Sequence, residues 1–247
     1  MDWSFQLYSA RNFQPWQNVL KTLGALGYAQ VEGFGAVYEE PATFRAELDK
    51  NGLAMPSGHF GIDLLEQDFA KAAGIARTLG MKLIACPWLE PAERPTDAEG
   101  WRAFGRRLAA IGAKANDAGF DFAWHNHDFE FVPVGGVVPQ RLILEAAPEV
   151  GWEMDVAWVI RGGSDPLHWI EEFGPRILAV HVKDIAPQGL ATDEDGWSDV
   201  GHGTVDWAGL VTALRKNTPA KYFVMEHDNP ADFERFASRS IAAAKTF

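Results

Sequence analysis

Short runs of β-forming apolar residues alternate with amphipathic stretches along the whole chain, and this alternation constrains the fold more than any other feature. The 247 residues hold eight such pairs, so the repeat is about 30 residues long. Strands that alternate with helices pair in parallel, and eight repeats of this length predict an α/β fold, a closed (β/α)8 TIM barrel. We expect a single domain over residues 1–247. The predicted strands are 5–10, 28–35, 56–62, 82–89, 121–127, 151–159, 176–185 and 221–228.

The stretches between these runs carry helix signals. In 98–119, Trp101, Phe104, Leu108 and Ile111 are spaced by three and four residues, which indicates one buried helix face. Neither GxGxxG nor GxxxxGK[ST] follows a predicted strand, which argues against a nucleotide-binding fold. Glycines follow several predicted helices, as expected for C-terminal stops, at Gly27, Gly80, Gly119 and Gly174.

The chain is acidic, with 22 Lys and Arg against 34 Asp and Glu and a net charge of −12. Phosphate recognition needs clustered cations, so this balance disfavours nucleic acid and anionic membranes as partners. It favours a small neutral or metal-associated substrate. The sequence leaves the oligomeric state open, a homo-oligomer included.

Cys86 is the single cysteine, so the chain forms no internal disulfide. Its apolar neighbours in IACPWL favour a buried thiol over a nucleophile. Residues 1–16 lack the pattern of a signal peptide, and no run reaches the roughly 18 apolar residues of a membrane span. We therefore expect a cytoplasmic protein.

Ionisable side chains recur where the predicted strands end. His125, Asp155, His181 and Glu226 each lie in an otherwise apolar run, where an unpaired charge is costly. The carboxyl ends of the strands of a TIM barrel meet at one face, and that face carries the active site. One carboxylate or imidazole from each of the last four strands makes a four-ligand set for a divalent metal, with positions left for substrate.

Each of these residues also has an ordinary interpretation. A histidine at a strand end is often a hydrogen-bonded rim residue. Asp184 and Asp228 are positioned to cap helices or to form salt bridges, and Lys183 can pair with Asp155 or Asp184. Asp128 and Glu130 fall on the opposite strand parity to His125 and are interpreted as structural.

Five motifs in order, WHNHDFEF, EMDVAWVIRGGSDP, HVKDI, DVGHGTVDW and VMEHD, resemble the sugar phosphate isomerase/epimerase group of xylose-isomerase-like TIM barrels. In the second half of the chain the resemblance extends to individual motifs. In the first half it concerns the order of the predicted strands and helices. It implies a divalent ion, Mn²⁺ first, with Co²⁺, Mg²⁺, Fe²⁺ and Zn²⁺ also compatible. Carried over by position, it assigns Asp155, His181 and Glu226 as ligands. His125 stands where members often have a glutamate.

The resemblance also implies how protons move. In the family's epimerases, two ligand glutamates flank the substrate carbon, and His125 places that symmetric scheme in doubt. Glu226 remains a base, and the opposite acid is His127 or Lys183. Each lies two residues beyond a ligand and so on the same strand face, and a metal ion nearby would lower the pKa of the lysine.

The implied reaction is α-proton abstraction from a small sugar or keto-sugar through a metal-stabilised enediolate. Trp88 and Trp158 are candidates to line the pocket against sugar C–H faces, and Glu32 and His59 to bind hydroxyl groups at its rim. We expect an unphosphorylated sugar, because no cluster of Arg and Lys is evident.

Four functions compete at this point. The first is a sugar isomerase or epimerase. The second is a lyase or dehydratase that eliminates from a keto-sugar, including 3-keto-glycoside cleavage, for which one base suffices. The third is the abasic-site endonuclease branch of the same fold, which the acidic charge disfavours. The fourth is a sugar-binding barrel without catalysis.

Overall fold

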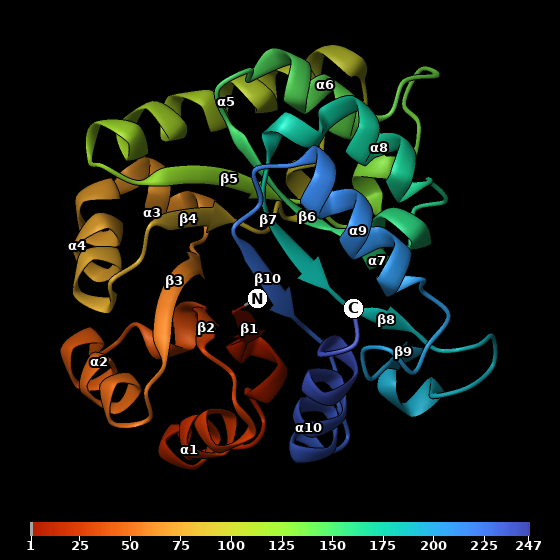
Figure 1. Ribbon diagram of the computed structural model, residues 1–247. Helices are drawn as coiled ribbons and strands as arrows, with labels where there is room; N and C mark the ends of the chain where they lie inside the picture. Colours follow the sequence, from red (N-terminus) through yellow and green to blue (C-terminus); the bar gives the residue numbers. More distant parts are fainter. Residues whose placement is uncertain (1) are drawn as a thin grey trace.

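The computed structural model describes residues 2–247, and the predicted barrel is confirmed there. Eight parallel strands close in the order β1-β10-β7-β6-β5-β4-β3-β2. Figure 1 shows the helices arranged around these strands. Residue 1, the first of the predicted domain range, lies outside the described residues. The barrel strands are β1 Trp3–Gln6, β2 Gln30–Gly33, β3 Ala54–His59, β4 Leu83–Cys86, β5 Asp121–His125, β6 Gly151–Asp155, β7 Ile177–Val182 and β10 Tyr222–Met225.

Helices connect consecutive barrel strands, as a parallel sheet requires. The α-helices are α1 Trp16–Leu26, α2 Pro41–Lys50, α3 Ile62–Gln67, α4 Phe69–Leu79, α5 Ala98–Asp117, α6 Pro139–Ala146, α7 Val156–Arg161, α8 Pro166–Phe173, α9 Trp207–Asn217 and α10 Phe233–Ala244. Short 3-10 helices are η1 Leu7–Ala10, η2 Gly35–Val37, η3 Pro91–Glu93, η4 Phe129–Phe131, η5 Gly174–Arg176 and η6 Thr192–Glu194. A separate two-stranded sheet pairs β8 Asp184–Ile185 with β9 Trp197–Ser198.

Helix α5 illustrates how the outer layer forms. Its predicted apolar face is buried, and Asp97 begins the helix by accepting a hydrogen bond from the backbone N–H of Gly100. The helix packs closely on α6, because Gly105 has no side chain: a Cβ there would lie 2.9 Å from the carbonyl oxygen of Ile143 and 2.9 Å from Cβ of Ala146.

The predicted strand over 151–159 is too long. β6 ends at Asp155, whose side chain accepts a hydrogen bond from the backbone N–H of Trp158 and so begins helix α7. Val156, Trp158 and Val159 favour strands intrinsically, but the N-cap and the packing of α7 override that weak preference.

The other predicted strands also change their limits, most of them by a few residues at each end. The first strand ends at Gln6, and 7–10 forms η1. The strand over 176–185 stops at Val182, because 184–185 pairs with β9 instead. The helical stretch after β3 divides into α3 and α4 at Asp68, which caps α4.

Among the predicted glycine stops, Gly27 and Gly80 adopt the left-handed conformation, with φ of 92° and 85°, and end α1 and α4. Gly119 is also left-handed, two residues after the end of α5 at Asp117. Gly174 differs, because its φ of −48° is right-handed and the chain continues into η5. Helix α8 therefore ends at Gly174 as predicted, but without a left-handed cap.

The barrel interior is apolar at one level and polar at the next. Leu83, Ala123 and Ala179 are fully buried and pack together. Towards the carboxyl ends of the strands, inward positions carry buried carboxylates and imidazoles instead, such as Glu153 and His181. The fold therefore concentrates ionisable groups where a TIM barrel carries its active site.

Within residues 2–247, none of the helices has the length and apolar character needed to cross a membrane.

Candidate active site and metal centre

A cavity of about 540 Å³ opens at the carboxyl ends of the barrel strands, within the usual size range of small-molecule sites. Its wall is rich in aromatic rings, from Tyr8, Phe34, Trp88, Phe129 and Trp158. Its polar lining includes the predicted site residues His59, His125, His127 and Glu226. The fold thus brings residues from most of the strands to one mouth.

Four predicted metal ligands meet at the base of this cavity, and we call His125, Asp155, His181 and Glu226 the upper cluster. One ligand atom of each lies within 4.8 Å of the others. They come from the ends of β5, β6 and β7 and from the residue after β10. All four are buried, with at most 5% of the residue surface exposed. The fold assembles the predicted set, and metal binding by it stays a prediction.

The donor chemistry of the upper cluster fits a divalent ion. Oδ2 of Asp155 is buried without a hydrogen bond and has Nζ of Lys183 at 3.4 Å, so it keeps a lone pair that a metal ion can use. Nδ1 of His181 lies 2.8 Å from Oε2 of Glu226, so both point to the same place. Two imidazoles and two carboxylates suit first-row transition ions.

The environment sets the protonation of these ligands. Burial lowers the pKa of His125 well below its ordinary value, and the positive charge of nearby groups adds to this, so its imidazole is neutral and able to ligate. Burial raises the pKa of Asp155 to about 6, although Lys183 opposes the shift. Burial would also raise the pKa of Glu226, but Lys183 and His181 hold it well below its ordinary value.

Lys183 lies buried behind the ligands among three carboxylates. Its Nζ contacts both oxygens of Asp228 at 2.8 Å, Glu226 at 3.3 Å and Asp155 at 3.4 Å. Burial would lower the pKa of this lysine, but Asp155, Asp228 and Glu226 raise it, opposite to the shift expected from a neighbouring cation alone. Its alternative salt bridge to Asp155 is present, whereas within residues 2–247 Asp184 is not a partner.

His127 faces the cavity as a neutral imidazole. Burial, followed by the charge of Lys183, lowers its pKa to about 3. Its ring stacks on Phe129 and meets the edge of Trp88. These aromatic contacts hold the ring in place. Its Nδ1 is buried without a hydrogen-bond partner and so keeps its hydrogen-bonding capacity.

A family model described as a xylose isomerase-like TIM barrel matches residues 20–245 of the chain. The chain belongs to the xylose isomerase-like TIM barrel family. The chain is similar to the rhizopine catabolism protein MocC of Rhizobium meliloti, 24% identical over 94% of this chain and 86% of that protein. An inosose dehydratase of Lacticaseibacillus casei is 22% identical over 88% of this chain and 85% of the relative.

The fold of this family member also matches solved structures. A sugar phosphate isomerase/epimerase from Parabacteroides distasonis superposes with a TM-score of 0.81 at 23% identity, covering 98% of this chain and 93% of that one. At this identity the likeness concerns the fold. The resemblance read from the sequence motifs is thereby confirmed at the level of family and architecture.

Glu32 does not lie at the rim, where it was predicted to bind substrate. It is fully buried inside the barrel, and its carboxylate accepts hydrogen bonds from Nε2 of Gln6, at 2.8 Å, and from Oγ of Ser57. It also contacts Nε2 of His181 at 2.7 Å. The cause is that β2 points the side chain inward, where β1, β3 and, from across the barrel, β7 supply partners.

His59 reaches the cavity from below rather than from the rim. Its Nε2 lies 2.6 Å from Glu153 and 3.1 Å from Glu32. Burial alone would lower the pKa of His59, but these two carboxylates raise it to about 10.

Glu153 is the site residue to which sequence reasoning gave no role. It is fully buried, and burial together with Glu32 raises its pKa to about 7. It also contacts Nδ1 of His125 at 3.3 Å. A signal was available, because Glu153 lies two residues before Asp155 in a buried strand and therefore shares its inward face.

The two candidate tryptophans both line the cavity. Trp88 is 38% exposed at the mouth, where the guanidinium of Arg94 lies over its ring. Trp158 lies deeper, against His127 and Trp197. Their contact with substrate stays a prediction.

Asp184, interpreted as a helix cap or salt-bridge residue, organises a loop instead. Its carboxylate accepts hydrogen bonds from the backbone N–H groups of Ile185, Gly201, Gly203 and Val205. This fixes the glycine-rich segment beside β8, away from the residues that line the cavity.

Of the two residues interpreted as structural, Glu130 is fully buried and accepts hydrogen bonds from Nε1 of Trp124 and the backbone N–H of His127. Asp128, by contrast, lines the cavity.

Proposed function

We propose that the protein is a divalent-metal-dependent enzyme that removes the proton next to the carbonyl group of a small keto-sugar or keto-cyclitol and expels a substituent from the adjacent carbon. The observation that carries this proposal is an asymmetry in the upper cluster. Of its four members, His125 and Glu226 line the cavity, so substrate faces one ligand carboxylate and one neutral imidazole. Elimination needs one base, whereas the two-carboxylate epimerase scheme needs a second one.

Glu226 is the proposed base. Its carboxylate stays ionised because Lys183 and His181 hold its pKa low, and it lies at the cavity surface. Lys183 does not line the cavity, so we assign it to orienting Glu226 and Asp228 and to balancing their charge. On this view Glu226 takes the α-proton and returns it to the departing oxygen on the same face, which leaves the enzyme as it began.

His127 and the aromatic wall bind the substrate in this proposal. The neutral ring of His127 supplies a hydrogen bond to a hydroxyl group. Trp88 and Trp158 offer flat apolar faces to C–H groups. A divalent ion held by the upper cluster would polarise the carbonyl group and stabilise negative charge on its oxygen, and Mn²⁺ is our first candidate.

Support also comes from relatives that carry the name inosose dehydratase and align with most of the chain. The isomerase or epimerase first expected shares the initial proton transfer, but in that reaction no substituent leaves and the proton returns to carbon. The small-molecule partner and the exclusion of nucleic acid remain predictions from the −12 charge.

The test is to incubate the Mn²⁺-loaded protein in D₂O with keto-sugars and keto-cyclitols that carry a β-hydroxyl or a 3-keto-glycosidic bond, and with free ketoses. We expect release of water or aglycone, and a loss of about 10²–10⁴-fold in rate for Glu226→Gln. The exposed Glu234 on α10 provides the matched control, Glu234→Gln, with unchanged rate. Deuterated epimers or isomers without any release would reject elimination and favour the isomerase.

A further inference from the structure

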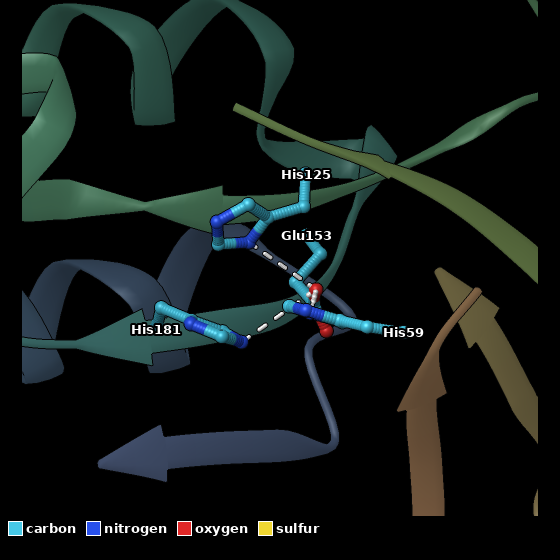
Figure 2. A group of neighbouring side chains, drawn as sticks. All are labelled: His59, His125, Glu153 and His181. Atoms are coloured by element: carbon cyan, nitrogen blue, oxygen red, sulfur yellow. Dashed lines mark hydrogen bonds and ion pairs between the residues drawn. The ribbon is translucent and has the colours of Figure 1, made fainter. Parts of the chain in front are cut away.

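Below the upper cluster, ring nitrogens and carboxylate oxygens from five strands point to one place, and we call Glu32, His59, His125, Glu153 and His181 the lower cluster. They come from β2, β3, β5, β6 and β7. Figure 2 shows three of the imidazoles directed at the carboxylate of Glu153. Four of these residues, without Glu32, have ligand atoms that all lie within 4.8 Å of one another.

The separations between donor atoms are close to those of a coordination sphere. Oε2 of Glu153 lies 2.6 Å from Nε2 of His59, 3.3 Å from Nδ1 of His125 and 3.6 Å from Nε2 of His181. Tetrahedral ligands at the usual bond lengths are about 3.4 Å apart. The separations to His125 and His181 match this value. The separation to His59 is shorter and would have to open by less than about 1 Å for an ion to bind.

Two polar atoms of the lower cluster, Oε1 of Glu153 and Nδ1 of His125, are buried without a hydrogen bond, and both residues are at most 2% exposed. Nδ1 of His125 has only the 3.3 Å contact with Oε2 of Glu153. Such atoms are costly unless a ligand or ion completes them. Glu32 and Glu153 also place two carboxylates inside the barrel, where His59 and His181 contact both of them.

An ion can reach this position from the cavity. His59 lines the cavity, and its side chain is 11% exposed. On the opposite side, Leu83, Ala123 and Ala179 close the barrel with apolar packing.

We propose that the lower cluster is a second divalent-cation position, selective for a zinc-type ion and occupied in alternation with the upper cluster. The lower cluster has three imidazoles beside its two carboxylates, which favours Zn²⁺, whereas the upper cluster has two of each and so a larger share of oxygen ligands, which favours Mn²⁺.

Alternation follows from His181. Its Nδ1 faces Glu226 of the upper cluster, and its Nε2 faces Glu32 and Glu153 of the lower cluster. A neutral imidazole has one free lone pair, so this ring serves one ion at a time.

The test is a set of metal titrations on four full-length variants, with Zn²⁺ alone and Mn²⁺ alone. His59→Gln and Glu153→Gln should weaken Zn²⁺ binding about tenfold or more and leave Mn²⁺ within threefold. Glu226→Gln should weaken Mn²⁺ binding about tenfold or more and leave Zn²⁺ binding within threefold. Glu130→Gln removes an equally buried carboxylate outside both clusters and should change neither affinity.

A second measurement follows Mn²⁺ release by electron paramagnetic resonance. One Zn²⁺ should release one Mn²⁺ from the wild-type protein, and His59→Gln should require at least tenfold more Zn²⁺. Because His59 is partly exposed, this variant carries little risk to folding, which the metal-free melting temperature checks.

The proposal is overturned if Zn²⁺ affinity survives both His59→Gln and Glu153→Gln, or if it falls equally in Glu226→Gln. Neither result bears on elimination, which is measured separately with the Mn²⁺-loaded enzyme. Conversely, if the protein is inactive but shows the expected pattern of metal affinities, the proposed reaction is rejected and the proposal of a second cation position stands.

Discussion

Individual residues here take their properties from neighbours that are distant in sequence. Lys183 and Glu226 are 43 positions apart by number, yet their side chains lie 3.3 Å apart and keep each other charged. Glu32 owes its place to Gln6, Ser57 and His181, from three other strands. The sequence marks such residues as unusual in apolar strands, and only the barrel brings them together.

Cys86 gives a prediction at this scale. The thiol is fully buried, and burial raises its pKa from 9.0 to about 12. Because a raised thiol pKa keeps the proton on sulfur below that value, the folded protein should hold no reactive thiolate at pH 8. A colorimetric thiol reagent should therefore not label the native protein and should label one thiol per chain in denaturant. Rapid native labelling would contradict the burial.

The secondary-structure elements follow the sequence in type and order, and they depart from it at their ends. Periodicity predicts all eight barrel strands and the buried face of α5. It does not predict the end of β6, because Asp155 begins a helix against the strand preference of the residues after it. Gly174 does end α8, but its conformation is right-handed and a 3-10 helix, η5, follows directly.

Two glycines in helices give a matched prediction. Gly105→Ala on α5 should destabilise the protein by about 1–3 kcal/mol, because the new Cβ would lie 2.9 Å from backbone and side-chain atoms of α6. Gly74→Ala on α4 meets nothing within 4 Å and should stabilise it by about 0.5–1 kcal/mol. Urea unfolding of both variants measures the difference. Equal effects would mean that α5 and α6 separate more easily than their packing indicates.

At the scale of the whole molecule, the barrel gathers buried carboxylates that a cation would stabilise. Glu32, Glu153, Asp155 and Glu226 all lie inside it and are at most 5% exposed. Folding an acidic chain around these groups makes stability depend on what neutralises them.

Metal addition should therefore raise the melting temperature. At a hundredfold excess over Kd, binding to the native state is worth about 2.7 kcal/mol, which corresponds to about 5–10 °C for a domain of this size. Thermal scans with Mn²⁺ or Zn²⁺, and after EDTA, measure the shift. The shift in melting temperature with Mn²⁺ should be smaller in the Asp155→Asn variant than in the wild-type protein. The absence of any shift with Mn²⁺, Co²⁺ and Zn²⁺ would favour the non-catalytic sugar-binding barrel.

The sequence by itself determined the strand–helix repeat, the barrel and the four residues of the upper cluster, because these depend on local periodicity, on ionisable residues at the ends of apolar strands and on the resemblance of the motifs to a known family. Only the tertiary structure decided that Glu32 lies beneath the site, that Glu153 belongs to it and that Lys183 lies behind Glu226. These facts depend on which way each side chain points in the closed barrel and how deep it lies. The depth is set by the stagger between neighbouring strands, which no single strand encodes.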